Sequence, residues 1–315
     1  MNKIERMNAV LRNEIPDRTP AGFWHHYPGS DSVEQMAENH LSLYRTTDMD
    51  IIKVMQDYPY PLSGQLQSTA DWYKIRFPGK SSPEYQKMEE VLKRIVDGIS
   101  GEAMIFQTMF GPFKAAVMAY GNEAVMAHAR QDPKAVAAGV RIIAEGMAEW
   151  VDGYLGAGAS GIYFSAQFGE VGRFSREEWS DMVRTTDLLV LNAVRAHDGK
   201  FSILHICGEP EYSFETHLDR YGDYPADLFN WSVKDNHYSL ERGRDFFQKP
   251  ILGGMNNKGF ILNGTEEQIR NEVQEIIRKF GRRGLMIGAD CTIQGKGIDP
   301  LKLRTAVEAA HQFTE

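Results

Sequence analysis

The sequence predicts an α/β protein: a (β/α)8 TIM barrel with an insertion after the second strand, in a single domain over residues 1–315. Three observations lead to this fold class. Eight short apolar segments have the composition of buried strands, and nearly all are separated by helical sequence, which favours a barrel over an open sheet. The length of 315 residues suits one such barrel. No internal repeat, low-complexity segment or linker divides the chain.

The strands are identified as short runs of apolar, β-prone residues. They lie at residues 21–24, 49–54, 103–107, 161–165, 201–206, 227–231, 250–253 and 284–288.

Amphipathic spacing and end signals predict the helices between the strands. Ser175 with Glu178 and Thr265 with Gln268 form capping boxes that start two of them. Residues 57–82 are rich in Pro, Tyr, Gly and Ser, so we expect a long ordered loop that could lie over one end of the fold. The predicted helices are 3–13, 33–45, 83–97, helical sequence after 111–113, then 133–154, 175–196, 265–280 and 300–313.

Charge and composition narrow the classes of partner. The net charge is −8 and the pI about 5.7, so nothing suggests affinity for nucleic acid or an anionic membrane. The charged start, Met1–Arg6, lacks the apolar core of a signal peptide, and no stretch approaches the roughly 18 apolar residues that span a bilayer. We therefore expect a soluble, cytoplasmic protein, in which two cysteines are free or metal-bound rather than paired.

The ends of the fifth and eighth predicted strands carry the chemistry. His205 and Cys207 are two apart at the end of one strand and so share a face, and Cys291 follows the other strand. Strand ends converge at the mouth of a barrel, and one imidazole with two thiols suits a zinc ion with a fourth position open. Two buried free thiols beside a satisfied core histidine are the alternative, and a Cys207–Cys291 disulfide is a weaker one.

These residues also carry a resemblance to a known family. The chain resembles the uroporphyrinogen decarboxylase superfamily over nearly its whole length, and within it the zinc-dependent corrinoid methyltransferases, which include methylcobamide:coenzyme M methyltransferases. The resemblance is carried by Gly111–Phe113, Gly156–Ala159, His205–Gly208, Gly253–Asn257 and Gly288–Cys291.

The His-x-Cys pair with a distant cysteine is specific to that branch, where the corresponding positions bind zinc. The resemblance therefore implies Zn²⁺ on His205, Cys207 and Cys291 and a corrinoid (methylcobalamin) on a partner corrinoid protein. It also implies a small-molecule methyl donor or acceptor, such as a thiol, tetrahydrofolate or a methoxylated compound, and a monomer or homodimer.

Two other functions stay open. Decarboxylases of the superfamily hold substrate carboxylates with an arginine-rich segment, but residues 22–28 contain no arginine. Asp57 does fall where those enzymes keep an aspartate, so a decarboxylase or lyase acting on a small acid is one alternative. A non-catalytic zinc- or corrinoid-binding protein is the other. We predict Asp57 as a catalytic proton acceptor or a partner of the zinc site, against a loop-capping role.

The fourth zinc ligand is not apparent, because residues 230–233 contain no acid where several relatives carry one. Water, substrate, Asp57, Glu170 and Asp290 are the candidates. Glu170, which follows the fourth strand, is also predicted as a catalytic residue, against a solvated loop acid.

Three residues are predicted to contact the substrate or corrinoid: His25, Tyr58 and Asn256. Adjacent histidines on an extended segment face opposite ways, so at most one of His25 and His26 enters the mouth. The alternative for each residue is an ordinary loop or core position.

Overall fold

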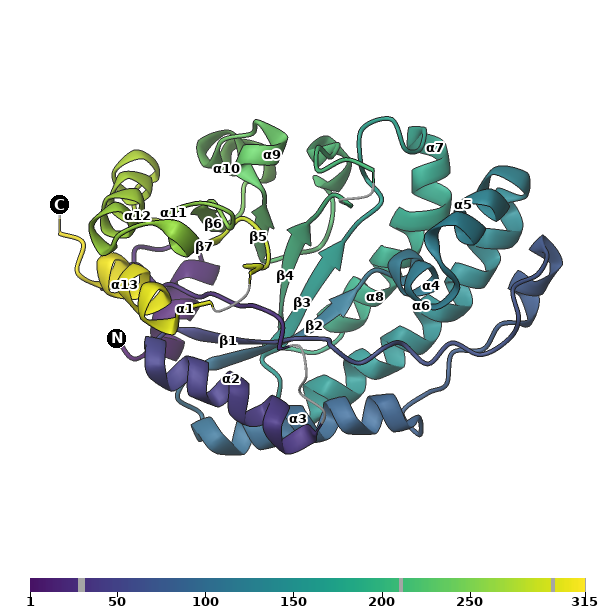
Figure 1. Ribbon diagram of the computed structural model, residues 1–315, viewed down its shortest axis with the longest axis horizontal. Helices are drawn as coiled ribbons and strands as arrows, with labels where there is room; N and C mark the ends of the chain where they lie inside the picture. The colour runs from purple at the N-terminus through teal and green to yellow at the C-terminus, as the bar shows by residue number, and fades with distance from the viewer. Residues whose placement is uncertain (28–31, 210–211, 296–297, 315) are drawn as a thin grey trace.

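A parallel sheet of seven strands, in the order β1 to β7, forms the centre of the protein. The computed structural model describes residues 1–27, 32–209, 212–295 and 298–314. The sheet curls into a barrel with helices along its outer face, which confirms the predicted fold class (Figure 1). The strands are β1 Ile51–Val54, β2 Met104–Phe110, β3 Gly161–Ala166, β4 Phe201–Ile206, β5 Leu228–Trp231, β6 Ile251–Met255 and β7 Leu285–Ala289.

The predicted first strand, residues 21–24, is not a regular strand, so the expected count of eight is wrong for the described residues. This segment instead links the two edges of the sheet. Gly22 N–H donates to Ile287 O of β7 (2.9 Å), and Asp50 N–H, just before β1, donates to Ala21 O (2.9 Å). Pro20 has no N–H to donate, but its carbonyl oxygen accepts from Ile287 N–H (2.8 Å) and continues this link.

Side chains along each strand point alternately into the barrel and outward to the helices, so the buried apolar residues form an inner and an outer layer. Inward side chains form a barrel core of Met104, Phe106, Ile203, Leu228, Leu252, Met286 and their neighbours. Met7 and Val10 of helix α1 (Lys3–Leu11) belong to this core and close its amino-terminal end. One layer further along the same strands the inward residues become polar: Lys53, Thr108, Ser165, His205 and Asn230. The closed end therefore supplies stability, and the carboxyl end of the strands is left for function.

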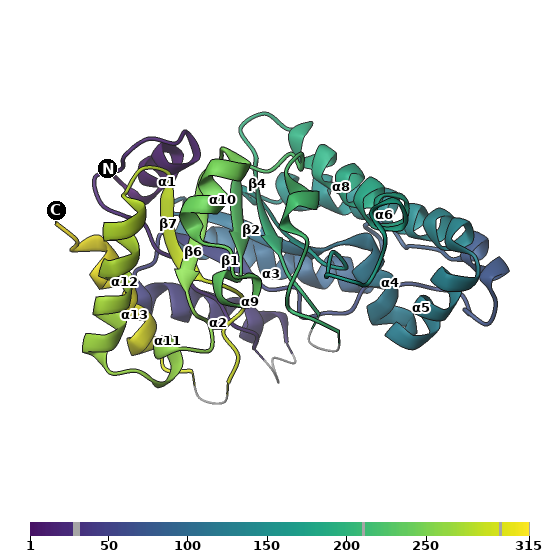
Figure 2. The same cartoon turned by 90° about the horizontal axis from the view of Figure 1, so that it is seen from above.

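The helices cover the outside of the sheet, with α12 and α13 on one side, α4 to α6 on the other, and both chain ends beside α13 and α1 (Figures 1 and 2). Both predicted capping boxes are present, at Ser175 and at Thr265. The predicted helix 175–196 contains one π turn, η2 (Ser180–Arg184). No helix in the described ranges is both long and apolar enough to cross a membrane. The remaining helical bounds are α2 Val33–Thr47, η1 Thr69–Lys74, α3 Pro83–Ile99, α4 Pro112–Tyr120, α5 Asn122–Gln131, α6 Pro133–Gly156, α7 Arg176–Trp179, α8 Thr185–Arg195, η3 Leu218–Tyr221, α9 Val233–Asn236, α10 Leu240–Phe247, α11 Phe260–Asn263, α12 Glu266–Phe280 and α13 Pro300–His311.

The insertion between β1 and β2 runs outward along α6. The Trp72 ring sits so close to Gly139 that a Cβ there would lie 2.4 Å from it, and Phe77 packs on Trp150 with ring centroids 4.9 Å apart. The beginning of the insertion, from Met55 to Tyr60, reaches the carboxyl end of the barrel, where the Tyr60 hydroxyl accepts from Phe110 N–H of β2 (2.9 Å). The long loop is thus mainly a packing element rather than a cover over one end.

Candidate metal centre

Strand β4 delivers two of the three predicted ligands. His205 lies in register with Ser165 of β3 and Asn230 of β5, in the middle of the sheet. Cys207 N–H continues the ladder by donating to Ala166 O (2.9 Å). The next residue has to be Gly208, because a Cβ there would lie 2.4 Å from Ser213 O and 2.6 Å from the Phe214 Cα. The chain can therefore fold back over the strand end and enclose the cysteine.

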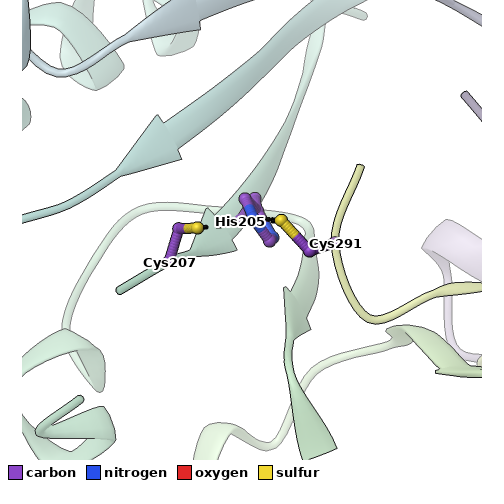
Figure 3. Close-up of side chains that lie close together, drawn as sticks. All are labelled: His205, Cys207 and Cys291. Atoms are coloured by element: carbon purple, nitrogen blue, oxygen red, sulfur yellow. Dashed lines mark hydrogen bonds between the residues drawn. The ribbon is translucent and has the colours of Figure 1, made fainter. Parts of the chain in front are cut away.

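Cys291 arrives from the end of β7, and Figure 3 shows the three side chains pointing toward one another. The two sulfurs are 3.8 Å apart, and Cys291 Sγ is 3.4 Å from His205 Nε2. Two zinc–sulfur bonds of ~2.3 Å at a tetrahedral angle span about 3.8 Å between sulfurs, and a sulfur–nitrogen pair spans about 3.6 Å. The two distances are close to these values and all three donor atoms lie within 4.8 Å of one another, so the group could hold a tetrahedral zinc ion, while the sulfurs are too far apart for a disulfide bond of about 2.05 Å.

Asn230 fixes the orientation of the histidine. Its amide nitrogen donates to Leu252 O (2.8 Å) and Ala289 O (3.2 Å), so its Oδ1 must be an acceptor. That oxygen accepts from His205 Nδ1 at 2.5 Å and from the Tyr163 hydroxyl at 3.1 Å. The proton of the neutral imidazole is therefore on Nδ1, and Nε2 presents its lone pair to the thiols.

The pKa values of the two thiols are shifted in opposite directions. The hydrogen bond from Cys207, opposed by burial, lowers the pKa of Cys291 well below its ordinary value. The same bond, together with burial, raises the pKa of Cys207 well above its own ordinary value. The cause common to both shifts is the contact between the two sulfurs, which are 3.8 Å apart. A thiolate is the form of cysteine that binds metal.

The triad lies between two cavities. The larger, of about 260 Å³, opens on the side of β1 to β4 and is lined by Lys53, Thr108, Tyr163, Ser165 and Glu209 among others. The smaller, of about 110 Å³, lies on the side of β5 and β6. Both are lined by all three residues of the triad. An ion held there would offer its fourth position to a bound small molecule.

Lys53 lies on the inner face of β1 in the larger cavity and is 6 % exposed. Burial lowers the pKa of its ammonium group to about 7, against the opposing effect of Cys291, Asp57 and Cys207. Neither Lys53 nor Asn230 was predicted as a site residue. The available signal was one charged or amide residue interrupting an otherwise apolar strand.

Asp57 lies at the rim of the larger cavity and contacts the neighbouring His26, which lines the cavity. His26, not the predicted His25, lines the larger cavity. Asp57 Oδ1 contacts His26 Nδ1 at 2.5 Å, and its Oδ2 accepts from Tyr27 N–H at 3.3 Å. His25 turns away onto the Tyr27 ring, with ring centroids 4.5 Å apart. One of the two adjacent histidines thus enters the mouth, as the alternation of an extended segment requires.

Glu170 and Asp290 are both 0 % exposed and support the backbone around the site. Glu170 pairs with Arg173 (2.8 Å) and accepts from the Glu209 N–H (2.9 Å), so it holds the loop after β4. Its burial does not fit a solvated loop acid. Asp290 accepts from Val233 N–H (3.1 Å) at the start of α9. Among the described residues, the group of possible metal ligands consists of His205, Cys207 and Cys291, without a fourth acid.

Tyr58 and Asn256 do not line either cavity within the described part of the chain. Tyr58 packs against the outer core, with the Lys87 ammonium 5.6 Å from its ring centroid. Asn256 Oδ1 accepts from Lys258 N–H (3.0 Å) and shapes the turn after β6. Its neighbour Asn257 lines the smaller cavity instead.

The fold and the site define a class of α/β barrels that bring one imidazole and two thiols together at the carboxyl ends of their strands. The sequence model of the uroporphyrinogen decarboxylase (URO-D) family matches residues 49–313, and the chain belongs to this family.

Solved structures share the fold at low sequence identity. A methyltransferase from Methanosarcina mazei superposes with a TM-score of 0.81 at 15% identity, covering 98% of each chain. A B12-independent methionine synthase from a Shewanella species gives 0.62 at 12% identity, covering 94% of this chain and 92% of that one. A putative vitamin-B12 independent methionine synthase from Listeria monocytogenes gives 0.57 at 12% identity, with 90% and 87% covered. A search of curated proteins gave no significant match.

Proposed function

We propose that the protein is a zinc-dependent methyltransferase that moves a methyl group between a corrinoid on a partner protein and a small molecule. The observation that carries the proposal is the spacing of three donor atoms, with 3.8 Å between the sulfurs and 3.4 Å from Cys291 Sγ to His205 Nε2. The family membership and the fold shared with a methyltransferase support it. The reducing environment that free thiols require supports a cytoplasmic location.

His205 through Nε2, and the sulfurs of Cys207 and Cys291, would hold the ion. When bound, zinc lowers the pKa of a coordinated thiol or polarises a methyl donor. The protein's own contribution is orientation, because Asn230 fixes the imidazole and Gly208 lets the chain fold tightly behind the cysteine. A small molecule in the larger cavity then meets the triad from one defined side.

His26 is suited to move the proton of an acceptor thiol. Its Nδ1 is engaged by the Asp57 carboxylate, which leaves Nε2 as the basic atom, and the ring lines the larger cavity. Asp57 would act through His26 rather than on the substrate itself. A corrinoid on the partner protein would supply or take up the methyl group, and His26 would accept through Nε2 the proton that an acceptor thiol loses when it is methylated.

The test has two parts. Zinc content of the purified protein should be close to one per chain and should fall sharply in Cys291→Ser, while His217→Ala, a histidine outside the site, should keep it. Methyl transfer from methylcobalamin to a small thiol should be lost on chelation and restored by zinc.

The proposal fails if zinc content is far below one per chain and indifferent to Cys291→Ser. Full activity on a small carboxylic acid after chelation would favour the decarboxylase alternative. Zinc binding without turnover on any methyl donor or acceptor would favour a non-catalytic binding protein.

A further inference from the structure

Lys53 places a primary amine on the inner face of the barrel, where the neighbouring positions are apolar. Ile51 and Met55, two residues away on either side, share this face and belong to the barrel core. Only 6 % of Lys53 is exposed, yet it is among the residues that line the larger cavity. The amine is therefore shielded from bulk water but can be reached by a small molecule in that cavity.

No charged group of the described residues contacts this amine. Nζ lies 3.1 Å from the Met55 sulfur, 4.4 Å from the Tyr163 ring centroid and 5.3 Å from the Trp24 ring centroid. A thioether and ring faces stabilise an ammonium group less than a carboxylate in contact does. The surroundings of Nζ therefore disfavour the charged form of the amine.

The charges that act on Lys53 from beyond contact distance do not change this result. Burial lowers the pKa of Lys53 to about 7, and the charges of Cys291, Asp57 and Cys207 oppose this shift without cancelling it. At neutral pH a large share of Lys53 is therefore an uncharged amine. Such an amine has the free lone pair that a nucleophile needs.

The second lysine of the larger cavity is in a different state. Lys114 Nζ contacts Glu209 Oε2 at 2.9 Å. A carboxylate at this distance stabilises the ammonium form, in which the nitrogen has no lone pair to donate. The same cavity thus contains one lysine held in an ion pair and one with an unpaired amine, so Lys114 is an internal control for the reactivity of Lys53.

An unpaired, buried amine can capture a carbonyl compound. The nitrogen adds to the carbonyl carbon, a carbon–nitrogen double bond forms and the carbon–oxygen bond breaks. The oxygen leaves as water with the two hydrogens of the amine, so the step needs no oxidant or reductant. The volume of the cavity is about 260 Å³, or roughly nine water molecules at ~30 Å³ each, which suits a carbonyl compound of a few carbons.

We propose that Lys53 is a covalent binding site for small aldehydes and ketones, which it captures as an imine in the larger cavity. The ring faces and the thioether around Nζ suit the carbon chain of such a molecule, and Thr108 and Ser165 line the same cavity with hydroxyl groups. The inference goes beyond the proposed function, because it assigns a second chemistry to the cavity and requires neither a corrinoid nor methyl transfer.

The closing experiment traps the imine on the protein as purified. Butanal and sodium cyanoborohydride are added at pH 7, so that any imine is reduced to a stable secondary amine, and the modified lysines are identified by peptide mass spectrometry. An ordinary lysine, with a pKa of ~10.4, is less than about 0.1 % neutral at this pH. Lys53 should therefore react about 10- to 100-fold faster than Lys114, and unfolding in urea should abolish the difference.

Two controls test whether the fast reaction belongs to Lys53 and to the cavity. Lys53→Met removes the amine at similar volume and should lose the fast reaction while the slow labelling of other lysines continues. Oxidised dextran, a polymeric aldehyde too bulky to enter the cavity, should react with exposed lysines and spare Lys53.

Equal rates at Lys53 and Lys114 in the folded protein overturn the inference, and so does a fast reaction that persists in Lys53→Met. Reaction of Lys53 with oxidised dextran as fast as with butanal also overturns it, because the amine would then not be confined to the cavity. The assay involves no methyl transfer. Absence of methyl transfer would therefore contradict the proposed function and leave this inference standing.

Discussion

Replacing Asn230 with alanine tests whether a residue that is not a metal ligand raises metal affinity by orienting the ligand His205. The side chain makes four hydrogen bonds, to His205, Tyr163, Leu252 and Ala289. Removing it leaves the imidazole free to rotate and to exchange its proton between the two nitrogens. Loss of such an orienting partner lowers metal affinity by about 10- to 100-fold, which corresponds to about 1.4 to 2.7 kcal/mol.

The variant should also be less stable, because it leaves buried polar groups without partners at about 1 kcal/mol or more each. Asn236→Ala is the matched control. Asn236 is another buried asparagine, on the wall of the smaller cavity, whose side chain bonds Thr216 N–H (2.8 Å) and Ser232 O (2.9 Å) and, among the described residues, makes no hydrogen bond to His205. It should lose stability in a similar way and keep wild-type zinc affinity. Asn230→Asp keeps an oxygen for His205 but places a carboxylate against two carbonyls, so it should lose stability and retain zinc.

Zinc affinity is measured by competition with a chromophoric chelator, and stability by urea unfolding of the metal-free protein. Zinc binding by Asn230→Ala as tight as that of wild type, or an equal weakening in Asn236→Ala, would contradict this role of Asn230. Either result would mean that His205 is oriented by something other than the amide of residue 230.

Three further predictions concern stability in urea unfolding of the metal-free protein. Lys53→Met should stabilise the protein by about 1 to 4 kcal/mol below pH 7, because burial lowers the pKa of Lys53 to about 7 and its charge is unpaired. The gain should shrink as the pH rises from about 7 toward about 10, because the folded lysine is then neutral and the free-energy cost of removing its proton on folding falls as the pH approaches the ordinary pKa of lysine. A loss of stability in the variant would contradict this account. Asp187→Asn should stabilise by about 1 kcal/mol or more at pH 7, because burial raises the pKa of Asp187 well above its ordinary value. Wild-type stability should therefore fall as pH rises above about 4, where only the unfolded carboxyl ionises, and an identical pH profile in the variant would refute this. Gly161→Ala should destabilise by about 3 kcal/mol, because its Cβ would lie 2.0 Å from the Phe201 carbonyl oxygen; the control Gly156→Ala, with nothing within 4 Å, should stay within about 1 kcal/mol of wild type.

The residues of the candidate site that lie at strand ends could be predicted from the sequence. His205, Cys207 and Cys291 are rare residue types directly after apolar runs, and parallel strands bring such positions to one end of a barrel. Residues on irregular segments were predicted less well. His25 and Asn256 are each one position from the residue that lines a cavity, His26 or Asn257, because local backbone geometry decides which neighbour points inward.

The sequence by itself determined seven of the eight predicted strands, the fold class and the identity of the three candidate ligands, because these follow from local periodicity and from the chemistry of side chains. Only the tertiary structure decided the distances among the ligands, the pairing of Asn230 with His205, and the isolation of Lys53 among aromatic rings. The reason is physical. Each of these properties joins segments that are far apart along the chain, and contact between them is settled by how the whole barrel packs and closes.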